Sequence, residues 1–181
     1  MVCPRCISTV ERVLRQAGLA VQEVNLGEAI LNEPEEILDL PQINKTLLSE
    51  GFELIYDREK QLTEQIKNLL ILFVEELPNQ EALFNTSAYL SEKVQVPYPQ
   101  LSKIFSRQEH TTIEKYFIRL KIEKVKELIS YNQFTLSEIA YKLKYSSLQH
   151  LSNQFKQVTG VSVSDYKQNS ITPRTSLDAL L

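Results

Sequence analysis

The chain has 181 residues, a length that accommodates one large domain or two small ones. Its apolar fraction of 43% and charged fraction of 24% are typical of globular proteins and exclude a largely disordered or collagen-like chain. The longest apolar run, residues 69–74, is far shorter than the ~20 residues of a membrane-spanning helix, so we expect no membrane partner. The net charge of −3, taken over the whole chain, argues against nucleic-acid binding.

Cys3 and Cys6 are the only cysteines. A secreted mini-protein carries several cysteines at spread positions, so we expect no secretory leader, a cytoplasmic location and reduced thiols. A CxxC pair in that compartment is a metal or redox site more often than a structural bridge.

The first 58 residues predict short elements in the order helix, strand, strand, helix, strand. Gly18 and Gly51 fit the C-terminal ends of the two helices, and Pro41 delays or interrupts the second one. The expected helices cover about residues 7–17 and 37–48, and the expected strands cover 20–26, 29–31 and 52–56.

Residues 59–77 predict one amphipathic helix, and the chain from about residue 80 onward predicts only helices and short turns. We therefore expect a front domain at 1–58, a connecting helix at 59–79, a helical domain at 80–170 and a tail at 171–181.

The charge divides in the same way. Residues 1–60 hold 6 Lys and Arg against 11 Asp and Glu, a net charge of −5, whereas residues 85–168 hold 12 against 7, a net charge of +5. The near-neutral total therefore hides an acidic piece joined to a basic one.

The basic half contains an internal repeat, which implies two copies of one supersecondary unit. Each copy predicts a short helix, a turn and a second helix, and Ser137 is the expected N-cap of the first helix in the second copy. Shifting residues 87–116 by 50 positions aligns these identities: Ser87/Ser137, Leu101/Leu151, Ser102/Ser152, Phe105/Phe155 and Tyr116/Tyr166.

The second helix of each copy combines an apolar face with a face of hydrogen-bonding side chains, as a helix-turn-helix unit requires. Amides of Gln and Asn bond bidentately to adenine, Ser meets several base edges, and Lys reaches phosphates. A solvated face on an ordinary helical bundle is the alternative, but two copies and the basic balance favour DNA binding. The two polar faces comprise Tyr98, Ser102, Lys103 and Arg107 in the first copy and Gln149, Ser152, Asn153 and Lys156 in the second.

Residues 85–168 resemble the C-terminal DNA-binding domain of AraC/XylS transcription regulators, with the family's signature over 135–167 and its central linker helix over 112–129. The resemblance implies an all-α double helix-turn-helix domain of seven helices, whose two recognition helices enter successive major-groove turns. It implies that the base-facing residues include Tyr98, Pro99, Ser102, Lys103, Leu148, Gln149, Ser152 and Asn153.

Four positions depart from that family's pattern. Lys144 stands where the family often has a turn glycine, Val163 where it often has proline, and Lys121 and Asn153 where arginine is usual or common. These departures bear on affinity and base preference more than on the fold. The family's sugar-binding barrel is not expected, because residues 1–57 are too few and have the wrong pattern.

The segment from Met1 to Cys6 resembles the MxCxxC motif of heavy-metal-associated domains, which implies an α+β, ferredoxin-like front domain with its first strand missing. The positive end of the following helix and Arg5 favour thiolates at Cys3 and Cys6. Two thiolates select Cu(I) or another thiophilic ion and underfill a tetrahedral zinc site. A thioredoxin-like redox pair is the competing interpretation.

Together these patterns predict a cytoplasmic, sequence-specific regulator of transcription that binds double-stranded DNA, responds to a thiophilic metal and is not an enzyme. The connecting helix is a candidate for pairing in a homodimer. One alternative is a metal-handling or thiol-redox protein whose helical half is a protein-interaction module. A third is a metal-blind regulator whose front domain only self-associates.

Overall fold

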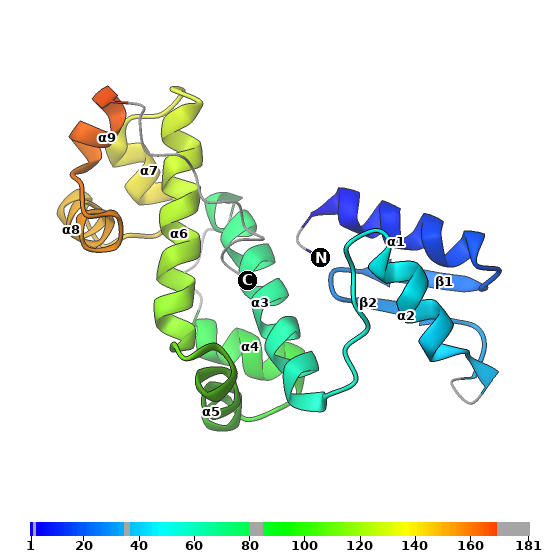
Figure 1. Cartoon of the computed structure of the whole chain (residues 1–181). Helices are drawn as coiled ribbons and strands as arrows, with labels where there is room; N and C mark the ends of the chain where they lie inside the picture. The colour runs from blue at the N-terminus through cyan, green and yellow to red at the C-terminus, as the bar shows by residue number, and fades with distance from the viewer. Residues whose placement is uncertain (2, 35–36, 80–84, 170–181) are drawn as a thin grey trace. The chain divides into compact units, whose positions relative to one another are not determined.

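The structure is a computed structural model that describes residues 1, 3–34, 37–79 and 85–169 (Figure 1). The chain divides into two compact units, Met1–Asn68 and Leu69–Leu181, and the division falls within helix α3. None of the described helices has the length and apolar character needed to cross a bilayer. The elements are α1 (Pro4–Gln16), β1 (Val21–Asn25), β2 (Glu28–Leu31), α2 (Leu40–Leu48), α3 (Arg58–Glu76), the 3-10 helix η2 (Leu77–Asn79), α4 (Thr86–Val94), α5 (Tyr98–Glu109), α6 (Ile113–Ser130), α7 (Leu136–Lys142), α8 (Leu148–Thr159) and α9 (Val163–Asn169).

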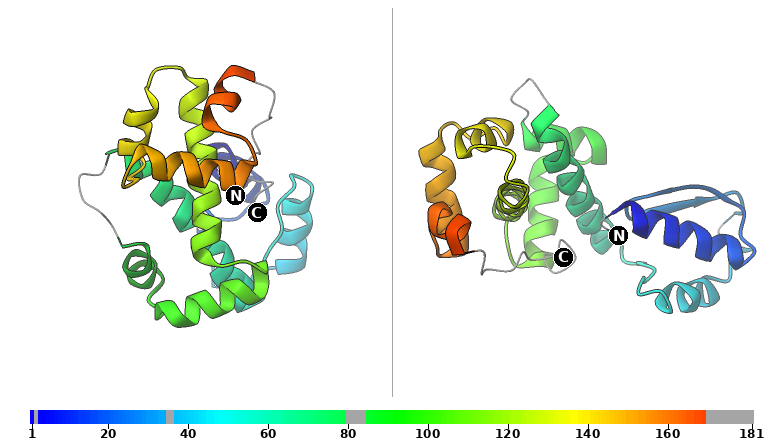
Figure 2. Two further views of the ribbon diagram at one scale, coloured as in Figure 1. Left: turned by 90° about the vertical axis from the view of Figure 1, so that its left-hand side faces the viewer. Right: turned by 90° about the horizontal axis from the view of Figure 1, so that it is seen from above.

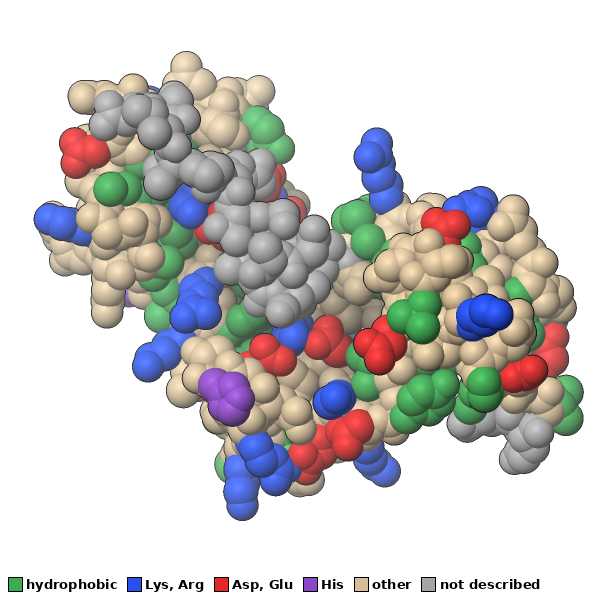
Figure 3. Space-filling model, viewed as in Figure 1, with side chains coloured by type: hydrophobic (Ala, Val, Ile, Leu, Met, Phe, Trp, Pro, Cys, Tyr) green, Lys and Arg blue, Asp and Glu red, His purple; other side chains and the backbone are tan. Residues whose placement is uncertain are grey.

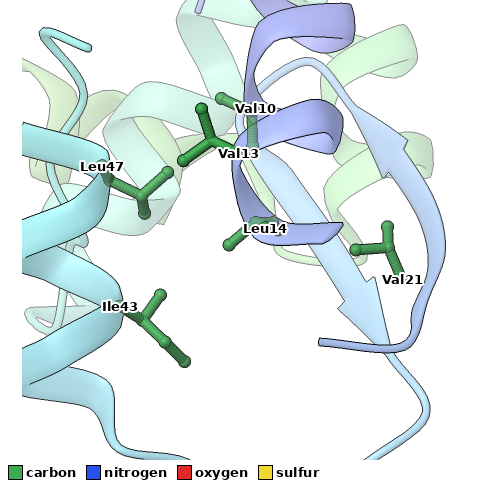
Figure 4. Packing of buried hydrophobic residues seen from close by; sticks show 6 residues of the cluster. All are labelled: Val10, Val13, Leu14, Val21, Ile43 and Leu47. Atoms are coloured by element: carbon green, nitrogen blue, oxygen red, sulfur yellow. The ribbon is translucent and has the colours of Figure 1, made fainter. Parts of the chain in front are cut away.

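In the first unit, α1 packs against both α2 and strand β1 of an antiparallel hairpin. The apolar spacing of α1 places Val10, Val13 and Leu14 on one face, and all three are at most 4% exposed. They meet residues from α2 and β1 in a small core (Figure 4). The buried members of this core are Val10, Val13, Leu14, Val21, Ile43 and Leu47.

The hairpin turn requires a glycine for two reasons. Gly27 has a φ of +89°, a left-handed conformation that side chains disfavour. The buried Asn68 of α3 donates a hydrogen bond from Nδ2 to the Leu26 carbonyl at 3.2 Å, and a Cβ on Gly27 would collide with that same amide. The turn is therefore fixed against the N-terminal part of α3.

The strand expected at 52–56 is wrong, because this described segment pairs with neither β1 nor β2. Its backbone donors go to α2 instead: Phe52 N–H bonds the Leu47 carbonyl at 3.0 Å, and Leu54 N–H bonds Asn44 Oδ1 at 2.8 Å. The first bond closes the end of α2 at Gly51, whose φ is +80°. The described residues of this unit thus form two strands, and the ferredoxin-like fold is not confirmed.

In the second unit, the long helix α6 lies between two helix-turn-helix units, α4–α5 and α7–α8. Helix α5 lies at the start of α6, and α7 to α9 lie together on one side of its later half (Figure 1). Helix α8 crosses the side of α6 (Figure 2). The second half of α3 is joined to α6 by an ion pair of 2.5 Å between Lys124 Nζ and Glu75 Oε2.

The internal repeat is confirmed in three dimensions. Phe105 and Tyr116 pack edge to face with ring centroids 5.5 Å apart, and the pair 50 positions later, Phe155 and Tyr166, does the same at 5.4 Å. The helices that carry Tyr116 and Tyr166 also begin in the same way. The hydroxyl oxygen of Thr112 accepts a hydrogen bond from the backbone N–H of Lys115, and that of Ser162 accepts one from the backbone N–H of Asp165. The two helix-turn-helix units are therefore equivalent, and both pack against α6.

Two details differ from the sequence-based expectations. The N-cap of α7 is Thr135, not Ser137, and Thr135 forms a reciprocal capping box with Glu138. Because the box satisfies two backbone donors, it fixes the start of α7 two residues earlier. Within 85–169 the described residues form six α-helices, and α3 precedes them as a seventh.

Candidate nucleic-acid interface

Helix α8 is placed with one face buried and the other in solvent. Its first turn is capped by Ser147, whose Oγ accepts from the His150 N–H at 3.0 Å, and its last turn ends at Gly160 with a φ of +79°. Leu151 and Phe155 are fully buried and hold the helix to the rest of the unit. The helix therefore presents a defined face outward.

The outward face carries the residues that the sequence predicts for base contact. Gln149 and Asn153 are exposed and one turn apart, and Gln149 Nε2 donates to Asn153 Oδ1 at 2.7 Å. Ser152 is half-buried beside them, Lys156 is exposed one turn further on, and Leu148 is 40% exposed at the start of the helix. The fold thus brings all five predicted residues of α8 to one exposed region.

Helix α5 is built in the same way. Pro99 occupies the first turn, where its missing N–H costs nothing, and Leu101 and Phe105 are fully buried. The predicted contact residues Lys103 and Arg107 are exposed, and Ser102 is half-buried.

Tyr98, at the start of α5, has a more restricted role than the sequence predicts. Its hydroxyl donates to the carboxylate of Glu114 on α6, a partner that sequence reasoning missed. Burial first, and then this hydrogen bond, raises the pKa of Tyr98, while the same bond lowers the pKa of Glu114. The hydroxyl therefore links the start of α5 to α6.

The sequence singled out Lys121 of α6 only as a position where the AraC/XylS family usually has arginine. In the structure its side chain contacts the turn between α7 and α8. Its Nζ lies 3.7 Å from the centroid of the Tyr145 ring, and burial lowers the pKa of Lys121 to about 8. Tyr145 is 8% exposed, and its hydroxyl has no hydrogen-bond partner among the described residues. A lysine in the apolar stripe of α6 is the sequence signal for this contact.

The turns of the two units share a left-handed residue just after the first helix. Gln95 has a φ of +58° and Lys144 a φ of +55°. The glycine that the resembled family often has at position 144 matches this geometry, which costs other residues roughly 1 kcal/mol. Lys144, in place of glycine, therefore lowers the stability of the fold by a small amount.

The charge of the segment that forms the two helix-turn-helix units suits a polyanion. Residues 85–168 have a net charge of +5, and Lys and Arg side chains project from the end of the unit that carries α5 (Figure 3). Lys103, Arg107, Lys115 and Arg119 are all exposed on α5 and the first half of α6. Phosphate contacts need exposed positive charge of this kind.

The two cysteines lie together at the start of α1. Cys3 is its N-cap residue, Pro4 follows, and the sulfurs of Cys3 and Cys6 are 3.5 Å apart and partly exposed, without a disulfide. Among the described residues no group of three or more Cys, His, Asp or Glu side chains is placed to hold a metal ion. The described residues therefore supply two sulfur atoms at this end of α1, without a third Cys, His, Asp or Glu side chain grouped with them.

Residues 90–169 match a family described as a helix-turn-helix domain, of the AraC type. No curated protein matches the chain at a significant level. A DNA-binding transcriptional dual regulator from Escherichia coli K-12 is similar in structure, at 16% identity and a TM-score of 0.49, over 58% of this chain and 91% of that one. The C-terminal domain of AraT, a response regulator from Geobacillus stearothermophilus, is similar at 18% identity and a TM-score of 0.50, over 66% and 98%. The AraT likeness shows a shared fold.

Proposed function

We propose that the chain is a cytoplasmic transcription regulator of the AraC type that binds double-stranded DNA with α5 and α8 in successive segments of the major groove. The observation that carries the proposal is the pair of equivalent helices, each anchored by a buried Leu and Phe, with exposed hydrogen-bonding and basic side chains on its other face. Helix α6 contacts both helix-turn-helix units and would keep the distance between α5 and α8 constant.

The base contacts in this proposal come from Ser102, Lys103, Gln149, Ser152 and Asn153, with Pro99 and Leu148 as apolar neighbours. Arg107 and Lys156, near the ends of the two helices, bind phosphates and set the register. No catalytic residue is part of the proposal.

The test is a titration of fluorescent duplex DNA with the full chain at increasing salt. Each neutralised phosphate contributes a slope of about 0.9 in log affinity against log salt, so several contacts give a steep loss of affinity. Lys156→Ala should lower the slope by about 1, whereas Lys60→Ala, an exposed lysine outside the helical unit, should leave it unchanged. Binding that is absent, or insensitive to salt, contradicts the proposal.

We also propose that Cys3 and Cys6 bind a thiophilic ion such as Cu(I), which would modulate the regulator. The support is the 3.5 Å separation of the two partly exposed sulfurs at the N-terminus of α1. Cys3 and Cys6 would hold the ion, which would supply a soft Lewis acid there, and Pro4 and the first turn of α1 keep the two sulfurs side by side.

Titration with Cu(I) against a coloured chelator tests this second proposal. The protein should compete for about one equivalent of metal, and the double variant Cys3→Ser, Cys6→Ser should not. If the wild type fails to compete for the metal, the metal proposal is wrong, and the result favours a redox pair at Cys3 and Cys6. Equal DNA affinity with and without Cu(I) favours the metal-blind regulator, whose front unit only self-associates. Metal or disulfide exchange without any DNA affinity favours the metal-handling or thiol-redox protein.

A further inference from the structure

The two amides on the outer face of α8 form a single hydrogen-bonding unit. Gln149 Nε2 donates to Asn153 Oδ1 at 2.7 Å, and both side chains are exposed. Whichever of the two amides is the donor, the donating amide keeps its carbonyl oxygen as an acceptor and the accepting amide keeps its NH2 group as a donor for an outside partner. The bond also holds the two side chains in place before any ligand arrives, which reduces the entropy lost on binding.

Such a unit matches one base much better than the others. Adenine presents an acceptor, N7, beside a donor, the N6 amine, in the major groove, whereas guanine presents two acceptors, N7 and O6. We infer that α8 reads an A·T base pair through the joint donor and acceptor of Gln149 and Asn153. This inference rests on the proposed function and adds the base preference of one half of the site.

The rest of α8 supports an A·T preference. The helix contains no arginine to pair with guanine and no carboxylate to accept from cytosine, and its one lysine, Lys156, is assigned above to a phosphate. Leu148 is 40% exposed and offers an apolar contact for a thymine methyl group. His150 is turned to the other side, since its Nδ1 lies 3.0 Å from Ser146 Oγ and its ring packs against Tyr145.

The repeat supplies an internal comparison. The positions of α5 that correspond to Gln149 and Asn153 are Pro99 and Lys103. Proline offers no side-chain hydrogen bond and the exposed ammonium offers only donors, which match the two acceptors of guanine. The two recognition helices should therefore read unlike segments, one rich in A·T pairs and the other containing G·C. From Gln149 to Lys156 the helix rises roughly 10 Å, which covers about three base pairs.

The experiment is selection of bound sites from random duplexes with the full chain, followed by affinity measurements on single-base variants of the selected site. Asn153→Arg identifies the base pair beneath α8, because it should change the preference at that one position from adenine to guanine by roughly tenfold or more. Gln149→Ala, which breaks the amide pair, should reduce the adenine preference at the same position. Gln133→Arg adds the same charge at an exposed position outside α8 and should change all affinities without altering the preference.

The outcomes separate the inference from the proposed function. The inference is overturned if a site is selected but the position altered by Asn153→Arg is G·C in the wild-type site. It is also overturned if neither Asn153→Arg nor Gln149→Ala changes the preference at any position. If no site is selected and no salt-dependent binding occurs, DNA binding itself is refuted.

Discussion

Replacing Lys121 by Met is expected to stabilise the helical unit. The ammonium of Lys121 is largely buried in α6, and its pKa falls from 10.5 to about 8 because burial disfavours the charged form. That difference corresponds to a cost of about 3 kcal/mol for the charged form, and the substitution also removes the contact with the Tyr145 ring at 3.7 Å. Met keeps the unbranched stem, so we expect a gain of about 1 to 3 kcal/mol at neutral pH.

The pH dependence has a definite sign. The pKa of Lys121 is lower in the folded chain than in the unfolded chain, so between about pH 8 and pH 10.5 the unfolded chain binds more protons. The penalty is therefore full below pH 8 and is relieved as the pH rises, so the wild type should approach the variant in stability.

Urea unfolding followed by far-ultraviolet circular dichroism measures both effects, since the helical unit dominates that signal. Lys115→Met, an exposed lysine on the same helix, is the matched control and should change stability by less than about 0.5 kcal/mol. A Lys121→Met protein that is less stable than the wild type at neutral pH refutes the reasoning. So does a stability gap that does not narrow as the pH rises.

Three further substitutions test local features by the same urea titration. Lys144→Gly should raise stability by roughly 0.5 kcal/mol, because a φ of +55° suits glycine; a loss would contradict this. Thr135→Ala should cost about 1 kcal/mol by removing the cap of α7, while Ser137→Ala should cost far less; equal losses would show that the cap is elsewhere. Gly27→Ala should cost at least about 1 kcal/mol more than Gly18→Ala, because only the first meets a buried amide although both have positive φ.

The helices were predictable because their patterns are local. The apolar stripe and Gly18 predicted the end of α1 but not its start at Pro4, and the repeat predicted both helix-turn-helix units. The ring contacts of Phe105 with Tyr116 and of Phe155 with Tyr166 were seen only in the structure. The segment 52–56 alternates like a strand, but its pairing depends on partners far away in the chain. Its backbone donors are taken by Leu47 and Asn44, a choice that no local pattern encodes.

The outer faces of α5 and α8 were also predictable, since burial of one stripe determines which side chains remain outside. The contacts of Tyr98 with Glu114 and of Lys121 with Tyr145 were not, because each joins two helices whose packing the sequence does not specify. The Gln149–Asn153 bond lies between these cases: the spacing of four places the amides together, but only the structure shows that they bond.

The central claim, that α5 and α8 read successive turns of one groove, is tested most directly by hydroxyl-radical footprinting of the full chain on its selected duplex. We predict two protected segments on one face of the DNA, centred about 10 base pairs apart. Gln149→Ala should weaken protection in one segment and Lys103→Ala in the other. A single protected segment, or two segments that respond equally to either substitution, would contradict the account.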